Sequence, residues 1–448
     1  MNYQFIDTLL MKNYNKKMKL KTIVTALLFL FGFTAIAQVN IKSQSKEFKL
    51  GDGLRFNVND GEYKFNISGF MQATYKYEKT EGAVANNYMN ANNTYLSISG
   101  SMFNEKLSFL LQNNYSNAKA LLDAWVAYTP VKNLKITFGQ KQTFTNNREM
   151  TFYEDKLQFA DRGIFSSEFS DTGREFGVFL ESEFGNDNFI IKPKFAITSG
   201  DGLNSFGANS TDIDQGSLKY GSRVDIHPLG KFKEGNDGYI SDLKHEDQLK
   251  VLIGTAYSYN IGASSKVGEA HYISNPNAVE QETNASNFAF TFYDSTGKEK
   301  HPDYRKWYGD ILFKYKGFSF LAEYVNTTAS NLEGSFINKI VTTPLYITEI
   351  SKYLVLGNGY NIQSGYVTKS GYSLDLKYEK LNQEFENKDS VLSNQEAYTL
   401  GITKYFKGNN LKIQSSVSAN NVDKFNTTSS AIEKVNTITA QFAIQVVF

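Results

Sequence analysis

Apolar and polar residues alternate along the C-terminal end of the chain, from Thr437 to Phe448. Counting back from Phe448, every second residue is apolar as far as Ile438, and the residues between them are mostly Gln and Thr. This period of two predicts a β-strand long enough to cross a tilted bilayer path. A strand that ends the chain on an aromatic residue is typical of an outer-membrane β-barrel. The alternative is the edge strand of a soluble sandwich.

Similar patterns recur along the whole chain, and no long helical periodicity competes with them. No shift in composition divides the chain, which indicates one domain. We predict sixteen strands, at Lys64–Tyr77, Tyr95–Met102, Leu107–Tyr115, Leu121–Tyr128, Leu134–Gln142, Glu175–Phe184, Phe189–Thr198, Leu218–Ile226, Leu249–Tyr259, Asp310–Tyr315, Phe318–Val325, Tyr360–Val367, Tyr372–Lys380, Ala397–Tyr405, Leu411–Ala419 and Thr437–Phe448.

The connections between these segments alternate between long and short. Short ones such as Phe103–Lys106 and Phe406–Asn410 are neighboured by long ones such as Glu78–Thr94 and Asn420–Asn436. Membrane barrels have short turns at one end and long loops at the other. The sequence therefore predicts an all-β fold, a transmembrane antiparallel β-barrel of about 16 strands. The connection His227–Gln248 is the exception, because its length does not suit a turn, and its role is not explained.

The charges support the same fold, because they gather on the polar face of each strand. In Tyr372–Lys380, the residues Asp375, Lys377 and Glu379 lie opposite an apolar face. A Lys or Arg that faces lipid at mid-depth costs about 2–4 kcal/mol, so charged side chains are expected in the lumen. Pro193 does not suit a central strand, and we expect a bulge there or a strand that begins later.

The N-terminus has the form of a secretory signal peptide, residues 1–37, with lysines before an apolar run and Ala35-Ile36-Ala37 at the cleavage site. The residues before Met18 are unusual for a signal, and Met18 is the alternative start. Residues 38–62 then lead into a barrel predicted over 63–448. Without the signal, five Lys and one Asp are lost from 47 basic and 46 acidic residues, which leaves 42 and 45 and a net charge of −3.

Several function classes find no support in the composition. The chain has no Cys, and its four His are scattered without ligand spacing, so no metal or other cofactor is expected. No nucleophile elbow or phosphate loop is present, so we do not expect an enzyme. The near-neutral charge gives no polybasic surface for nucleic acid.

Eight stretches of the mature chain are similar to a known family: Gly51–Gln72, Leu121–Pro130, Leu134–Lys141, Arg174–Leu180, Arg223–Leu229, Gly309–Tyr324, Tyr398–Gln414 and the terminal strand. In their order and spacing, they resemble the phosphate-selective porin O and P family. The resemblance implies a sixteen-stranded homotrimeric barrel with an inward-folded third loop, in which Arg and Lys draw phosphate to a central site. This chain has only six Arg, so that ladder transfers poorly.

The third loop of such a porin corresponds to Thr143–Arg174. We interpret it as a charged constriction, with a solvated external loop as the alternative. Lys141 is the foremost candidate, since it lies on the lumen side just before this loop, although a wall lysine paired with an acid would look the same. The candidates that line the pore and attract anions are Lys141, Arg148, Lys156, Arg162, Lys192, Lys194 and Arg223.

The function expected from these observations is that of a porin in the outer membrane of a Gram-negative bacterium. Small hydrophilic solutes or ions would diffuse through it passively, with an anion or phosphate preference as a further alternative. From a different class, the barrel would be an adhesion or binding platform through its long external loops, Asn260–Gly309 and Asn326–Gly359. Steady ion current separates the two, because a platform with a plugged lumen conducts none.

Overall fold

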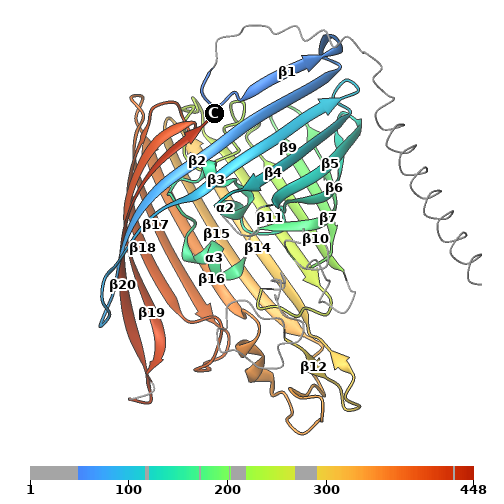
Figure 1. Cartoon of the computed structure of the whole chain (residues 1–448), viewed down its shortest axis with the longest axis vertical. Coiled ribbons are helices and arrows are strands. Elements are labelled where there is room, and N and C mark those ends of the chain that lie inside the picture. The colour runs from blue at the N-terminus through green and yellow to red at the C-terminus, as the bar shows by residue number, and fades with distance from the viewer. Residues whose placement is uncertain are drawn as a thin grey trace, which may run out of the picture.

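The computed structural model describes residues 49–116, 121–170, 173–200, 202, 218–267, 290–426 and 429–448. The predicted signal peptide, residues 1–37, lies outside this part of the chain. Within it, no helix is both long and apolar enough to cross a membrane. Sixteen antiparallel strands instead form a closed barrel (Figure 1), as the sequence predicted.

Each strand of the barrel pairs with its neighbours in the chain, and the last strand closes on the first. A two-residue strand, β8 (Phe184–Gly185), continues the line of β7. The sixteen strands are β2 (Tyr63–Thr80), β3 (Asn86–Met102), β4 (Leu107–Asn114), β5 (Leu121–Val131), β6 (Leu134–Gln142), β7 (Arg174–Ser182), β9 (Ile190–Thr198), β10 (Lys219–His227), β11 (Lys250–Asn260), β14 (Asp303–Tyr315), β15 (Phe318–Ser330), β16 (Gly357–Val367), β17 (Tyr372–Gln383), β18 (Gln395–Tyr405), β19 (Leu411–Asn426) and β20 (Ala431–Val447).

The seam of the barrel lies between β2 and β20. Their register runs from Phe70 opposite Val447 to Thr80 opposite Thr437, and Gly69 and Phe448 exchange two backbone hydrogen bonds at its end. Beyond this point a short strand, β1 (Leu54–Val58), pairs with the same edge of β2. The edge that β20 leaves uncovered is therefore covered by the segment that precedes the barrel.

The two faces of the strands have the polarity that the sequence predicted. On β17, Leu374 and Leu376 are 54% and 53% exposed, whereas Asp375 between them is fully buried in the barrel. On β20, Phe442 and Ile444 point outward and Gln445 points inward. An apolar outer surface over a polar interior is the arrangement that a lipid bilayer requires.

Three details of the strand predictions were wrong. β14 begins at Asp303 instead of Asp310. β3 begins at Asn86 and the β19–β20 hairpin extends through Asn426 and Ala431, so the predicted long loops there are largely strand. Polar residues can form strands above the lipid, where pairing alone decides the structure. No bulge occurs at Pro193, which pairs in register with Val224. Proline has no backbone N–H, and the strand pairing on the other side of β9 is interrupted beside Pro193, between β7 and β8.

The connections divide the barrel into a turn end and a loop end. The turn end carries the short connections at residues 103–106, 316–317, 368–371 and 406–410, and also the long connection 228–249. The other long connections lie at the loop end. At the loop end, β12 (Phe292–Tyr293), β13 (Glu299–Lys300) and the 3₁₀ helix η4 (Ile347–Lys352) belong to loops that share a buried apolar cluster. These loops therefore pack together into one cap at the loop end.

Candidate pore and constriction

In the connection between β6 and β7, residues 143–170 fold into the barrel, and we call them the lumen loop. It contains α2 (Arg148–Thr151), the 3₁₀ helix η2 (Glu154–Lys156) and α3 (Ile164–Phe169), and Figure 1 shows both α-helices inside the ring of strands. Phe165 and Phe169 of α3 are fully buried against wall residues such as Tyr308 and Leu381. The interior of the barrel therefore holds an apolar core of its own.

Small residues on the wall make room for this loop. A Cβ on Gly401 of β18 would lie 2.7 Å from the Phe159 ring, and one on Gly254 of β11 would collide with the Arg148 guanidinium. Any larger residue at either position would push the loop away from the wall. Glycine at a lumen-facing position of a strand is thus a sign in the sequence that something packs there.

Arg148 at the start of α2 anchors the loop to β10 and β14. Its Nε donates to Asp310 at 2.8 Å, and its Nη2 donates to Asp225. Arg223 of the wall bonds to the same two carboxylates, and all four side chains are nearly inaccessible. Two cations and two anions thus neutralise one another in a buried cluster, where removing one partner would leave an uncompensated charge.

The next residue, Glu149, ties the loop to β16 and β17. Its carboxylate accepts hydrogen bonds from Lys377 at 2.6 Å, from Gln363 at 2.8 Å and from Ser166 at 2.6 Å. Burial alone would raise the pKa of Glu149, but the Lys377 ammonium and these hydrogen bonds lower it from 4.5 to about 2. The group therefore stays ionised in the loop at any ordinary pH.

Wall carboxylates also bind the N-termini of the two short helices. Glu323 of β15 accepts from the backbone N–H of Glu149 at 3.0 Å, and Glu379 of β17 accepts from that of Phe165 at 3.0 Å. The first N–H groups of a helix lack partners within it, so a carboxylate there satisfies them. The wall thus supplies the caps that the loop sequence itself lacks.

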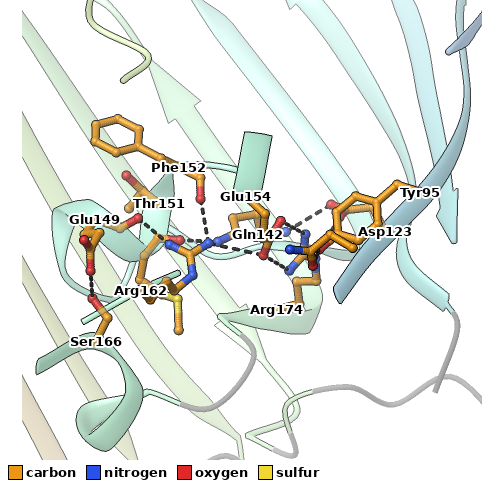
Figure 2. Close-up of polar contacts among 12 residues, drawn as sticks. Tyr95, Asp123, Gln142, Glu149, Thr151, Phe152, Glu154, Arg162, Ser166 and Arg174 are labelled. Atoms are coloured by element: carbon orange, nitrogen blue, oxygen red, sulfur yellow. Dashed lines mark hydrogen bonds and ion pairs between the residues drawn. The ribbon is translucent and has the colours of Figure 1, made fainter. Parts of the chain in front are cut away.

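On the side of β5 and β7, two arginines meet at Glu154, as Figure 2 shows. Arg162 donates to Glu154 at 3.2 Å and to the carbonyl of Phe152 at 2.7 Å. Arg174 donates to Glu154 at 3.3 Å and to Asp123 at 3.0 Å. Burial would raise the pKa of Glu154, but the two guanidinium groups lower it to about 2. Glu154 and Arg162 inside the loop are thereby tied to Arg174, the first residue of β7.

The lumen loop reaches across to the opposite wall. Lys412 of β19 donates to the carbonyl of Leu157 at 2.7 Å, and Lys306 of β14 donates to that of Phe169 at 2.8 Å. Gln445 of β20 donates to the carbonyl of Asp155 at 2.9 Å. As a result, most lumen-facing side chains from β10 to β17 are covered, among them the fully buried Asn361 and Asp375.

The wall from β3 to β9 differs, because several charged lumen side chains on β6, β7 and β9 remain partly exposed, although Asp123, Thr137 and Glu175 on the same wall are buried. Across the register, Glu181 of β7 lies between Lys135 of β6 and Lys194 of β9. Lys141 also donates to Glu181, at 2.6 Å, and its side chain keeps 13% of its surface exposed. We call Lys135, Lys141 and Lys194 the lysine cluster; with Glu181 it carries a net charge of +2. Lys194 also donates to Asp225 at 2.9 Å, and because the buried cluster around Asp225 is neutral, the joint net charge stays +2.

Aromatic rings support the lysine cluster. The ammonium groups of Lys141 and Lys194 lie 5.9 and 5.8 Å from the centroid of Phe144, the second residue of the lumen loop. The Lys135 ammonium lies 4.9 Å from that of Trp125. Within the described part of the chain, no carboxylate oxygen lies within 4.0 Å of Lys135. Its charge is therefore the least compensated of the three.

The seven candidates from the sequence fall into two groups. Between 13% and 34% of the side-chain surface stays exposed for Lys141, Lys192 and Lys194 on β6 and β9, and for Lys156 in the lumen loop. Arg148, Arg162 and Arg223 keep 12% or less, and each is bonded to carboxylates. The structure therefore gives these three arginines a role in holding the loop.

The selection of candidates missed Lys135, Lys306 and Arg174. Lys135 has lumen parity in the sequence pattern, but nothing there shows that it lies beside the same acid as Lys141 and Lys194. Arg174 and Lys306 fell in predicted loops, outside the predicted strands, so no parity was assigned to them. No group of His, Asp or Glu side chains among the described residues has the arrangement of a metal site.

Comparison with known proteins gives resemblance in fold only. No family model and no curated protein matches the sequence, so the likeness to the porin O and P family stays a prediction. Similar solved structures include OprB of Pseudomonas putida, with TM-score 0.49, 11% identity and coverage of 86% of this chain and 94% of that one. The outer membrane channel DcaP of Acinetobacter baumannii gives TM-score 0.48, 11% identity and coverage of 88% and 99%.

Proposed function

We propose that this chain is an outer-membrane porin that lets small hydrophilic solutes and ions diffuse passively across the membrane. The observation that carries the proposal is the asymmetry of the lumen. The lumen loop packs against the wall from β10 to β17, whereas charged side chains of β6, β7 and β9 remain partly exposed. Exposed charges inside a barrel need water, and a water-filled strip along this wall is a path for solutes.

The lysine cluster gives this path a preference for anions. Its net charge of +2 lies beside Phe144, where the lumen loop leaves the wall and the passage is narrowest in this proposal. A fixed positive charge in a narrow passage attracts anions and repels cations. Phosphate is one anion that would benefit, but the six arginines offer no exposed bidentate site for it, so a general anion preference is the proposal.

The experiment is a conductance measurement on the refolded, purified protein in planar bilayers. Stepwise insertion of steady channels with a reversal potential on the anion side of zero, under a salt gradient, is the expected result. Replacing chloride by phosphate at constant cation then ranks the two anions. A barrel that inserts without steady current would overturn the porin proposal. Assembly as a homotrimer is expected from the family resemblance, and chemical cross-linking in detergent tests it.

A binding platform is the second candidate, and the cap at the loop end favours it. Loops from three parts of the chain bury Phe290, Phe292 and Leu354 together, which gives this end a fixed shape. The same cap exposes Ile340, Tyr346 and Ile347 by 64% or more. A channel and a platform are compatible, and the absence of current would leave the platform as the main function.

A further inference from the structure

The connection between β10 and β11, residues 228–249, folds into the turn end of the barrel, and we call it the inner segment. Its Ile240 is fully buried in one apolar cluster with Phe152 and Leu157 of the lumen loop. The same cluster includes Leu252, Leu312 and Leu321, which point inward from the wall. The inner segment and the lumen loop therefore share a core across the lumen.

Lys314 of β14 fixes the inner segment to the wall. Its ammonium donates to the carbonyls of Tyr239 at 2.7 Å and Ser241 at 2.9 Å, and also to that of Asn236. The same ammonium lies 4.5 Å from the centroid of the Tyr239 ring. Three carbonyls and an aromatic face around one buried cation specify a single position for this part of the segment.

Further bonds carry the segment across the mouth. Asp242 accepts from the backbone N–H of Gly317, in the β14–β15 turn, at 2.7 Å. Ser241 and Tyr405 of β18 share a hydrogen bond of 3.1 Å between their hydroxyls. The segment leaves the wall at β10 and reaches β18. It therefore covers the turn end of the barrel along the wall from β10 to β18, which the lumen loop covers further inside.

On the open side, the segment presents Asp237 to the wall. The Lys192 ammonium of β9 lies 3.6 Å from the Asp237 carboxylate and 3.3 Å from that of Glu183. All three side chains are partly exposed, by 25% for Lys192, 34% for Asp237 and 46% for Glu183. We call Lys192, Asp237 and Glu183 the acidic gate. Lys231 lies 3.9 Å from both Glu183 and Asp187, so with this second pair the group still carries a net charge of −1, opposite in sign to the lysine cluster.

We propose that the inner segment forms a second constriction in series with the lumen loop, and that Asp237 sets its charge. The inference rests on the proposed function, because it assumes that solutes pass along the β3–β9 wall. Such a path meets the lysine cluster, with net charge +2, beside the lumen loop and the acidic gate at the turn end. Fixed charges of opposite sign in series enrich ions between them at one voltage polarity and deplete them at the other. The channel should therefore rectify.

The test uses Asp237→Lys in the full chain, which changes the acidic gate from −1 to +1 while the fold of the segment keeps its Lys314 contacts. Single channels of wild type and variant are compared in symmetric low salt at both polarities. The matched control is Glu62→Lys, the same change of charge at the same end of the barrel, where Glu62 is exposed in the turn between β1 and β2. We expect wild type and control to rectify alike and Asp237→Lys to lose the asymmetry.

A second variant replaces residues 232–246 by an Asn-Gly turn, and its conductance should exceed that of wild type severalfold. If the wild type conducts and Asp237→Lys rectifies to the same degree as the wild type, the second constriction is overturned and the porin proposal stands. A silent wild type with a conducting deletion would overturn passive diffusion and support closure by the inner segment. If wild type and deletion are both silent although heat-modifiable, both proposals fail. A deletion that does not fold leaves the Asp237→Lys comparison to decide.

Discussion

The lysine cluster makes the sharpest prediction about ion selectivity. Lys141→Glu removes one positive charge, adds one negative charge and brings the net charge of the cluster with Glu181 from +2 to zero. The backbone of β6 should tolerate the change, because the Lys141 side chain is partly exposed in the lumen and Glu181 keeps Lys135 and Lys194 as neighbours. The passage should therefore lose most of its preference for anions.

The size of the effect follows from Coulomb's law. An ion that passes roughly 5 Å from a unit charge in water gains or loses about 0.8 kcal/mol, and screening at 0.1 M salt reduces this to about 0.5 kcal/mol. Two charges are changed, so anions lose and cations gain about 1 kcal/mol each, and the anion-to-cation permeability ratio should fall by roughly 30-fold. At 1 M salt the Debye length is about 3 Å and the same change should be roughly threefold.

The assay is the reversal potential of the bilayer current under a salt gradient, at low and at high mean salt. Lys369→Glu is the control, since Lys369 is exposed on the turn 368–371, across the barrel from the cluster. The control should keep the wild-type reversal potential. Equal shifts from both variants would show that a diffuse field of the whole protein sets the selectivity, and an unshifted Lys141→Glu would remove the cluster from the path.

Three further outcomes test the barrel and its loop. The unboiled protein should migrate faster than the boiled one in SDS gels, because a closed barrel has no free strand edge, and equal mobility would contradict closure. Phe442→Lys should fail to assemble, at a cost of about 2–4 kcal/mol for a lysine facing lipid, whereas Gln441→Lys on the inner face should assemble normally. The pKa of Glu149 is lowered from 4.5 to about 2, so its pairing with Lys377 stabilises the loop fully above about pH 4.5 and is lost as the pH falls through about 2. Channel noise should accordingly stay constant from pH 7 to 4.5 and rise near pH 2, and a rise already at pH 5 would contradict the pairing.

The barrel wall could be predicted from the sequence because its physics is local. Alternation within a strand places Asp375 inside and Leu374 outside without knowledge of any neighbour. Turn and loop lengths add the up-and-down order. The prediction failed where pairing continues above the lipid, as at Asn86 in β3 and Ala431 in β20, because polar residues there carry no alternation.

The interior could not be predicted in the same way, because its contacts join residues far apart in the chain. Parity shows that Lys141 and Lys194 face the lumen, but only the sheet register places both beside Glu181. Arg148 looks like a pore residue until Asp225 and Asp310 are found around it. The length of the inner segment was visible in the sequence, yet its position depends on the carbonyl cage around Lys314, which no side-chain pattern encodes.

The seam between β2 and β20 has a consequence for how the chain folds. The hydrogen bond between Thr80 and Thr437 joins residues separated by 357 positions, while the other strand pairs of the barrel join neighbours along the chain. Contacts between distant residues form slowly, because the entropy of closing a long loop opposes them. Hairpins can therefore form early, but the edge of β2 stays open until the last strand has arrived. During that interval the chain exposes a long unpaired edge and needs protection from aggregation.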